Sequence, residues 1–211
     1  MQRAQGFFMN VNYQKILDET LVGITQADVK PSLLLHSCCA PCSSYVLEYL
    51  SVYFKITIFY YNPNIFPEQE YLKRVDEQKR FISILNEKNI DKINFIEGEY
   101  NPNVFDELIK GMENLPEGGE RCTKCYELRI NEAALMAKEM DFDYFTTTLS
   151  VSPMKNAEKL NKIGGELAEK HKLKYLFSDF KKKEGYKRSI VLSKQYGIYR
   201  QEYCGCRFSI G

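Results

Sequence analysis

Seven cysteines stand in three short groups, and their thiols are the most reactive side chains in this chain. The groups are Cys38-Cys39-x-x-Cys42, Cys122-x-x-Cys125 and Cys204-x-Cys206, with no cysteine outside them. Cysteine pairs this close in an intracellular chain favour metal binding or redox work over structural disulfides. Cysteines used only to fill a core would be scattered, so we interpret the three groups as one functional set.

Two kinds of metal site fit these thiols. Zinc takes four nitrogen or sulfur ligands, usually as two close pairs, and Cys38/Cys42 or Cys39/Cys42 with Cys122/Cys125 would supply them. An iron–sulfur cluster also needs four thiolates. Three observations favour iron–sulfur: seven thiols exceed one zinc site, neither of the two histidines has zinc-finger spacing, and adjacent Cys38 and Cys39 suit the edge of a bulky cluster.

The local sequence predicts how two of the groups are presented. Gly118-Gly119 precedes a helical pattern, so Cys122 and Cys125 should share one face of its first turn. A helix N-terminus favours thiolate over thiol. Cys204 and Cys206 could form a disulfide, which would close a small, strained and easily reduced ring, or they could ligate a second metal.

Alternating strand and helix patterns position these groups. Strands are expected at Ser32–His36, Phe54–Tyr61, Ile93–Ile96, Tyr144–Leu149 and Leu173–Phe177, and helices at Cys42–Tyr53, Glu68–Asn89, Cys122–Met140, Asn156–His171 and Tyr186–Tyr196. The alternation predicts an α/β fold, a parallel sheet of about five strands with helices on both faces. We expect one domain over residues 1–211, with about 25 N-terminal and about 15 C-terminal residues as extensions packed on it.

Three loops are expected at one edge of that sheet. The first strand runs into Cys38–Cys42, the second into Asn62–Pro67 and the fourth into Ser150–Pro153. In open parallel sheets, ligands bind outside the carboxyl ends of the strands. The unusual residues therefore fall where a site is expected.

Composition and charge narrow the class of protein. The chain has 211 residues, 44% hydrophobic and 27% charged, which excludes a disordered chain and a disulfide-stapled miniprotein. It has no apolar run of about 20 residues, and its start has no apolar segment of secretory length, so we expect a cytoplasmic protein with no membrane partner. Residues 170–188 carry a net charge of +6 against +1 for the whole chain, which favours a polyanionic partner.

Five motifs occur together and in order. They are His36-Ser37-Cys38-Cys39-Ala40-Pro41-Cys42; Tyr61-Asn62-Pro63-Asn64-Ile65 with Glu70-Tyr71 and Arg74; Glu120-Arg121-Cys122 with Cys125-Tyr126 and Arg129; Thr146-Thr147-Thr148-Leu149-Ser150 with Ser152-Pro153 and Lys155-Asn156; and Tyr203-Cys204-Gly205-Cys206. This series resembles the QueH-type epoxyqueuosine reductases nearly from end to end. The resemblance implies a fold like the adenine-nucleotide α-hydrolase (HUP) domains.

The resemblance also implies a reaction and a cofactor. The reaction is the reduction of epoxyqueuosine to queuosine at the tRNA wobble position, a step of queuosine biosynthesis and tRNA processing. Loss of the epoxide oxygen as water takes two electrons and two protons, so an oxidoreductase with a redox centre and an unidentified electron donor is required. The implied cofactor is a [4Fe–4S] cluster, with an additional mononuclear iron as a further possibility that could act as a Lewis acid.

Residue roles follow from the same resemblance. The implied cluster ligands are Cys38, Cys39, Cys122 and Cys125, with Cys204 and Cys206 as a redox-active pair and the role of Cys42 open. The expected substrate-binding residues are Asn62, Asn64, Glu70 and Arg74, although turn chemistry and a surface helix pair would also explain them. The expected tRNA contacts are Lys181, Lys182, Lys183, Lys187 and Arg188, interleaved with aromatic residues. His36 could relay a proton or be a hydrogen-bonded structural histidine.

Two rival functions stay open. An iron–sulfur tRNA sulfur-transfer enzyme would share the fold and partner but should need ATP. ATP pyrophosphatases of similar architecture carry a glycine-rich phosphate loop, whereas Ser37–Cys42 has thiols and a proline at that place, so ATP is not an expected substrate. A non-enzymatic zinc module that binds nucleic acid would instead be colourless and stable in air.

Overall fold

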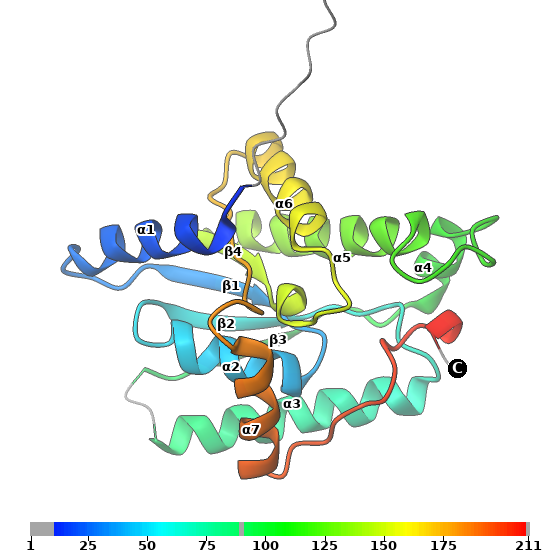
Figure 1. The fold of residues 1–211 in the computed structure, drawn as a ribbon, viewed down its shortest axis with the longest axis horizontal. Coiled ribbons are helices and arrows are strands. Elements are labelled where there is room, and N and C mark those ends of the chain that lie inside the picture. Colours follow the sequence, from blue (N-terminus) through cyan, green and yellow to red (C-terminus); the bar gives the residue numbers. More distant parts are fainter. Residues whose placement is uncertain (1–10, 89–90, 210–211) are drawn as a thin grey trace, which may run out of the picture.

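Four short strands form one parallel sheet in the computed structural model, which describes residues 11–88 and 91–209 (Figure 1). The strands are β1 (Ser32–His36), β2 (Lys55–Tyr60), β3 (Asn94–Glu97) and β4 (Tyr144–Thr147), in the order β3-β2-β1-β4. All three pairings are parallel, with Leu34 of β1 opposite Thr57 of β2 and Phe145 of β4. The predicted α/β fold with a parallel sheet is confirmed.

Helices cover both faces of the sheet. They are α1 (Tyr13–Thr25), α2 (Ala40–Leu50), α3 (Glu68–Lys88), α4 (Pro102–Leu108), α5 (Glu120–Glu139), α6 (Ala157–His171) and α7 (Gly185–Gln195), with short 3-10 turns η1 (Thr148–Val151) and η2 (Arg207–Ser209). In Figure 1, α2, α3 and α7 lie below the sheet and α5 and α6 above it. Side chains alternate along β1, so Leu33 and Leu35 pack in the core with α2 and Leu34 in the core with α5.

The fifth expected strand, Leu173–Phe177, does not form a strand among the described residues. Tyr175 makes one isolated parallel bridge to Phe145 at the β4 edge. After this bridge, the backbone forms hydrogen bonds with side chains instead of with a neighbouring strand. The Thr146 hydroxyl donates to the Leu176 carbonyl at 2.8 Å, and the Asn161 amide of α6 both donates to and accepts from the Ser178 backbone. The sheet of the described part therefore has four strands.

Other differences concern the ends of elements. The first cysteine-bearing helix begins at Ala40 rather than Cys42, because Pro41 is accommodated in a first helical turn. Helices α1 and α4 had no predicted counterpart. Leu17 and Leu21 of α1 join the core beside α2, while residues 1–10 and Asn89 lie outside the described residues.

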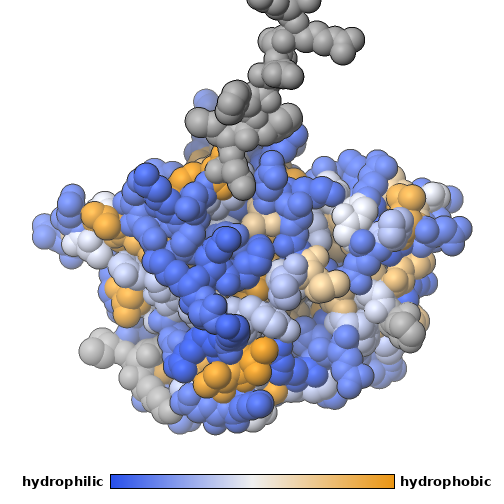
Figure 2. Space-filling view, viewed as in Figure 1, coloured by the Kyte–Doolittle hydropathy of each residue, from blue (hydrophilic) through white to orange (hydrophobic). Residues whose placement is uncertain are grey.

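The exterior is mainly polar on the side shown in Figure 2, where hydrophobic side chains form small separate patches. Within residues 11–88 and 91–209, no helix is both long and apolar enough to cross a membrane.

The strand order places a switch point between β1 and β4. The chain moves outward from β1 to β2 and β3, then returns to the other side of β1 for β4. Connections leave the carboxyl ends of β1 and β4 toward opposite faces of the sheet, which opens a crevice between them. The segments that follow these two strands, Ser37–Cys42 and Thr148–Val151, border this crevice.

Candidate metal centre and cleft

Three thiols lie together in the turn from β1 to α2. The sulfurs of Cys38, Cys39 and Cys42 are all within 4.8 Å of one another, and those of Cys38 and Cys39 are 3.7 Å apart. Cys39 is the extended N-cap of α2, and Pro41 fixes the first turn, so Cys42 follows one turn later on the same side. Sequence reasoning left Cys42 without a role, and the structure places it in this triad.

Buried hydrogen bonds hold the backbone of the triad. Gln78 of α3 accepts from the Ser37 hydroxyl at 2.9 Å and from the Ser43 hydroxyl at 3.0 Å. Asn62 donates to the Ser37 carbonyl at 2.8 Å, and the Tyr60 hydroxyl donates to the Cys38 carbonyl at 3.2 Å. The turn is thus fixed from α3 and from the end of β2.

The other four cysteines line a second, narrow cavity. Cys122 and Cys125 lie in the first turns of α5, as predicted from the glycine pair, and Gly119 caps this helix. Cys204 and Cys206 reach the same cavity from the C-terminal segment, as does Asn64 from the loop after β2. The Gly118 amide donates to the Cys122 sulfur at 3.2 Å. Groups separated by about 80 residues along the chain therefore share one cavity.

Arg74 of α3 ties the C-terminal segment to the rest of the fold. It pairs with Glu70 at 2.7 Å and donates to the carbonyls of Cys204 and Tyr203 at 3.2 and 3.3 Å. Gly205 adopts a left-handed φ of 121°, and a Cβ there would lie 2.9 Å from the Arg74 guanidinium. Only glycine lets the backbone between the two cysteines approach this closely.

Buried cations surround the thiols. Arg74, Arg121, Arg129 and Lys155 are each between 1% and 6% exposed. Among the described residues, Arg121 donates only to backbone carbonyls, and Arg129 donates only to the Cys125 carbonyl and the Asn62 amide oxygen. A buried charge without a counter-ion is costly. Anionic sulfur at the neighbouring cysteines is the charge that would compensate these two arginines.

The titration of the thiols follows this arrangement. Hydrogen bonds from Cys38 and Cys42, together with the charge of Arg74, hold the pKa of Cys39 well below its usual value. The same interaction raises the pKa of Cys38 to about 11 and that of Cys42 well above normal. Burial raises the pKa of Cys125 to about 12. Within the triad, the thiol of Cys39 is therefore the most acidic of the three.

Lys155 and Arg129 link the cavity to an open cleft. Lys155 donates to the Cys204 sulfur at 3.0 Å and pairs with Glu117 at 3.3 Å. Burial alone would lower the pKa of Lys155, but the neighbouring Cys204 raises it above its normal value. The cleft has a volume of about 390 Å³, and Cys38, Cys42, Cys204, Arg129 and Lys155 lie in its wall. Cys204, Arg129 and Lys155 also line the narrow cavity, so the two spaces adjoin.

The donor set fits a metal group. A tetrahedral ion with metal–sulfur bonds of about 2.3 Å holds its sulfurs about 3.8 Å apart, close to the Cys38–Cys39 separation of 3.7 Å. Both amide atoms of Asn64, Nε of Arg121 and Nη2 of Arg129 are buried without a partner among the described residues. N–H groups of this kind are suited to sulfide and thiolate acceptors. The cavity is thus lined by donors that would complement an anionic cluster.

The four predicted substrate-binding residues make different contacts in the structure. Asn64 faces the cysteine cavity. Asn62 is fully buried and holds the triad turn and Arg129. Glu70 and Arg74 pin the C-terminal segment, and the Tyr199 hydroxyl donates to Glu70. Their substrate role stays a prediction, since these contacts describe what they do within the fold.

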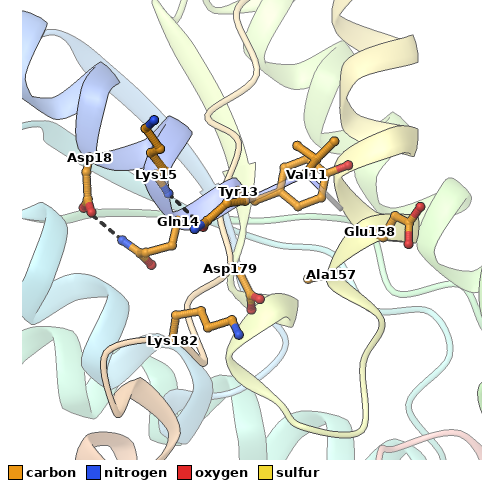
Figure 3. A pocket seen from close by; sticks show the side chains of 10 residues that line it. Val11, Tyr13, Gln14, Lys15, Asp18, Ala157, Glu158, Asp179 and Lys182 are labelled. Atoms are coloured by element: carbon orange, nitrogen blue, oxygen red, sulfur yellow. Dashed lines mark hydrogen bonds between the residues drawn. The ribbon is translucent and has the colours of Figure 1, made fainter. Parts of the chain in front are cut away.

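Four of the five expected tRNA contacts are already ion-paired. Lys181 pairs with Asp179, Lys183 with Asp18, Lys187 with Glu184 and Arg188 with Glu48. Lys182 lines a separate pocket of about 910 Å³ between α1 and α6, with Lys15, Asp18, Glu158 and Asp179 (Figure 3). The three carboxylates and two ammonium groups give this pocket a lining of mixed charge rather than a basic one. The positive field of residues 170–188 is therefore weaker than the composition suggests.

His36 is a structural histidine. It is fully buried, its Nε2 lies 3.1 Å from the Tyr61 carbonyl and its Nδ1 lies 2.9 Å from the Thr147 hydroxyl. The carbonyl requires a proton on Nε2, so the Thr147 hydroxyl donates to Nδ1. Burial, and then the charge of Arg129, lower the pKa of His36 to about 4. The imidazole is neutral at physiological pH and joins β1 to β4.

Sequence reasoning gave no role of their own to the buried cations Arg129 and Lys155 or to Gln201, which donates to the Cys39 sulfur at 2.9 Å. A signal for Arg129 was present. Cys122, Cys125 and Arg129 stand at i, i+3 and i+7 of one helix and so share a face. Lys155 and Gln201 lie in irregular segments, where spacing predicts no direction for a side chain.

Comparisons with known proteins show which family the chain is similar to. The family model described as "Epoxyqueuosine reductase QueH" matches residues 33–211. Proteins of that name from Staphylococcus epidermidis and Streptococcus pyogenes serotype M1 are 44% and 41% identical to the chain. Each match covers 94% of this chain, and 84% and 78% of the respective relative. The protein of that name from Thermotoga maritima is 35% identical, over 85% of this chain and 90% of its own length.

Proposed function

The chain belongs to the epoxyqueuosine reductase QueH family, and we propose that it removes the epoxide oxygen of epoxyqueuosine at the tRNA wobble position to give queuosine. As an epoxyqueuosine reductase it is an oxidoreductase of queuosine biosynthesis. One structural observation supports the proposed role of its cysteines. The cysteine triad and the four-cysteine cavity adjoin at the carboxyl edge of the sheet, among buried cations.

The reaction sets what the site must provide. Both C–O bonds of the epoxide break, a C=C bond forms, and the oxygen leaves as water, which consumes two electrons and two protons. We propose Cys38, Cys39, Cys122 and Cys125 as ligands of a [4Fe–4S] cluster, which would supply electrons at this edge when bound. Cys204 and Cys206 are the proposed redox-active pair. A mononuclear iron would draw on Cys42, the triad thiol outside that ligand set.

The chain's own cations suit the oxygen that departs. Lys155 and Arg129 both line the open cleft and both adjoin Cys204. Positive groups fixed at the place where negative charge develops stabilise a transition state without reorganisation. Burial would lower the pKa of Arg129, but the neighbouring Cys125 and Cys204 raise it above its normal value. Asn64, whose amide has no partner within the described part of the chain and faces the neighbouring cavity, is the most directly placed of the four proposed substrate residues.

A relationship to the adenine-nucleotide α-hydrolase (HUP) fold is part of the proposal. The parallel order β3-β2-β1-β4 and a helix that begins directly after β1 support it. In nucleotide-binding proteins that turn is glycine-rich, so that backbone N–H groups reach a phosphate. Here Cys38, Cys39 and Pro41 occupy the turn, and so we propose that the enzyme needs no ATP.

The partners follow from the chemistry. The substrate is a tRNA with epoxyqueuosine in its anticodon loop, and reducing equivalents come from an external donor. Because tRNA matures in the cytoplasm, we propose that location. Lys181–Lys183, Lys187 and Arg188 remain proposed phosphate contacts, through exchange of their internal ion pairs for RNA phosphates.

One preparation tests the function. The protein is purified without oxygen, its iron, sulfide and zinc are quantified, and it is incubated with reductant and tRNA that contains epoxyqueuosine. We expect a brown protein with absorption at about 400 nm, and queuosine in the digested tRNA by mass spectrometry without added ATP. A colourless zinc protein without turnover would support the nucleic-acid module, and strict dependence on ATP would support sulfur transfer.

A further inference from the structure

We infer that Tyr186 forms the stacking platform for the unpaired wobble base, so that the epoxide-bearing group enters the cleft toward Cys38, Cys42 and Cys204. This inference rests on the proposed function, because it names where the RNA partner inserts its modified nucleoside. It concerns binding by side chains of the chain itself and requires no particular occupant of the cysteine sites.

The cleft suits one nucleoside. Its volume of about 390 Å³ is at the lower end of the roughly 300–1,000 Å³ of sites that enclose small ligands. Tyr186, Met154 and Tyr203 supply ring and thioether surface on its lining, while Arg200 and Lys155 supply positive charge. Met154 is 68% exposed and Tyr186 is 37% exposed, which leaves apolar surface at the opening. A flat base ring on an anionic backbone complements this combination.

The backbone holds Tyr186 firmly in place. It stands in the first turn of α7, and this helix begins directly after Lys183 and Glu184, both of which have left-handed φ angles. Gly185 packs so closely that a Cβ would lie 1.9 Å from the Phe180 carbonyl and 2.4 Å from the Tyr45 ring. This contact fixes the start of α7 against α2. The Tyr186 ring therefore projects from a rigid backbone, so that fixing the ring against a base costs little conformational entropy on binding.

Arg200 completes the platform. Its guanidinium carbon lies 6.0 Å from the centre of the Tyr186 ring, and it is held by the Ser189 carbonyl and the Ser193 hydroxyl. Among the described residues, Arg200 makes no ion pair with a carboxylate. Its charge is thus free to meet a phosphate or a base oxygen, in contrast to the charge of Arg188 on α7, which is paired with Glu48.

The alternative place for the base is the pocket of Figure 3. That pocket also carries a tyrosine, Tyr13, but its ring already stacks on Phe177 at 6.3 Å. Its lining holds Asp18, Glu158 and Asp179 beside Lys15 and Lys182, and it contains no cysteine (Figure 3). The lining of the cleft holds three cations, Arg129, Lys155 and Arg200, beside Glu117 and Glu202. The cleft has both the charge and the neighbouring thiols.

The test compares two tyrosines that line different pockets. Full-length protein is titrated with a fluorescent anticodon stem-loop RNA that carries epoxyqueuosine, and Kd is measured by anisotropy. We expect Tyr186→Ala to weaken binding at least about five-fold and Tyr186→Phe to stay within about two-fold, because stacking needs the ring and not the hydroxyl. Tyr13→Ala is the matched control and should bind as wild type. Melting temperatures of all variants verify that they fold.

A second measurement distinguishes stacking of the wobble base from binding of the RNA backbone. The same hairpin with 2-aminopurine at the wobble position should lose fluorescence on binding to wild type and to Tyr186→Phe, but not to Tyr186→Ala. Wild-type affinity of a folded Tyr186→Ala, or a loss confined to Tyr13→Ala, overturns the inference while leaving the proposed reductase intact. If wild type binds the hairpin but forms no queuosine in the turnover assay, the proposed function fails instead.

Discussion

The ammonium of the buried Lys155 lies 3.0 Å from the sulfur of Cys204, which is partly exposed. The contact distinguishes Cys204 from Cys206, whose sulfur lies near the Ser209 hydroxyl and whose pKa is raised by burial. Cys204 also lines the open cleft, whereas Cys206 lines only the narrow cavity. The two members of the proposed redox pair therefore have different chemical environments, with Cys204 presented to the substrate side.

The first prediction concerns the reactivity of Cys204. Lys155→Met removes a charge-assisted hydrogen bond of about 1.5–3 kcal/mol, so we expect Cys204 to react with iodoacetamide at pH 7 about ten-fold more slowly. Peptide mass spectrometry over a time course gives the rate for each cysteine. Lys159→Met, which removes a lysine that contacts Gly118 and Thr123 instead, is the control. Equal rates in wild type and Lys155→Met would show that the ammonium does not activate this sulfur.

The second prediction concerns the buried pair that holds the C-terminal segment. Arg74→Met leaves Glu70, whose side chain is 11% exposed, without its partner, and also removes the donor to two backbone carbonyls. Breaking a buried pair from one side costs about 3–5 kcal/mol. We expect a loss of this size in the free energy of unfolding by urea. Lys162→Met breaks the exposed Lys162–Glu166 pair of α6 and should change stability by less than about 0.5 kcal/mol. Similar losses in both variants would contradict the assigned role of Arg74.

The third prediction concerns acid stability. Hydrogen bonds from the Ser32 backbone and hydroxyl, at 2.8 Å each, lower the pKa of Asp143 and join the starts of β1 and β4. The unfolded chain has the higher pKa, about 3.9, so this stabilisation is complete above that pH and is lost as pH falls through the folded value. Because Asp143 is exposed, we expect Asp143→Asn to cost only about 1 kcal/mol at pH 7.

The check is urea unfolding at several pH values. The difference between wild type and Asp143→Asn should stay constant above about pH 5 and shrink as pH falls below about 4, at about 1 kcal/mol of total change. Asp141→Asn is the control, since Asp141 has a left-handed φ of 55°, which asparagine tolerates well. A pH-independent difference for Asp143→Asn would mean that its carboxylate charge is not the stabilising feature.

Much of this arrangement could be predicted from local patterns. Strand β1 is an apolar run that ends two residues before Cys38, and the glycine pair marks the start of α5, so the carboxyl edge and the Cys122/Cys125 face follow from periodicity. The failure at Leu173–Phe177 has a physical cause. Its residues have strand propensity, but Thr146 and Asn161 satisfy the backbone with side chains. The strand propensity of a segment carries no information about which hydrogen-bond donor its backbone carbonyls will bind.

The convergence of the site depended on tertiary contacts. Spacing alone does not join Cys204 to Cys125, because Arg74 on α3 brings the C-terminal segment to the cavity. Nor does the composition of residues 170–188 reveal that Asp18 and Glu48, far away along the chain, neutralise Lys183 and Arg188. The net charge of a segment is a sum over its own residues. The electrostatic field at its surface also depends on which oppositely charged side chains from the rest of the chain lie beside it.

The fourth prediction uses two helical glycines with opposite surroundings. A Cβ at Gly164 of α6 would lie 2.2 Å from the Tyr175 ring, whereas one at Gly23 of α1 would meet nothing within 4 Å. We expect Gly164→Ala to destabilise by about 1–3 kcal/mol through overpacking, and Gly23→Ala to stabilise by about 0.5–1 kcal/mol through helix propensity. Thermal unfolding of both variants tests the pair. The same sign for both would mean that Tyr175 moves aside without cost.

The last prediction separates the cysteines that would hold iron from those that would exchange electrons. Cys39→Ser and Cys122→Ser should lose iron, sulfide and the absorption at about 400 nm, because each removes a proposed ligand. Cys204→Ser and Cys206→Ser should keep the iron and sulfide of the cluster but fail to form queuosine, because a serine hydroxyl cannot carry out thiol–disulfide exchange. Iron and sulfide per chain and queuosine by mass spectrometry, measured on one anaerobic preparation, decide between the roles. Normal iron and normal turnover in Cys204→Ser would exclude a redox role for the pair, and loss of cluster iron from that variant would make Cys204 a ligand instead.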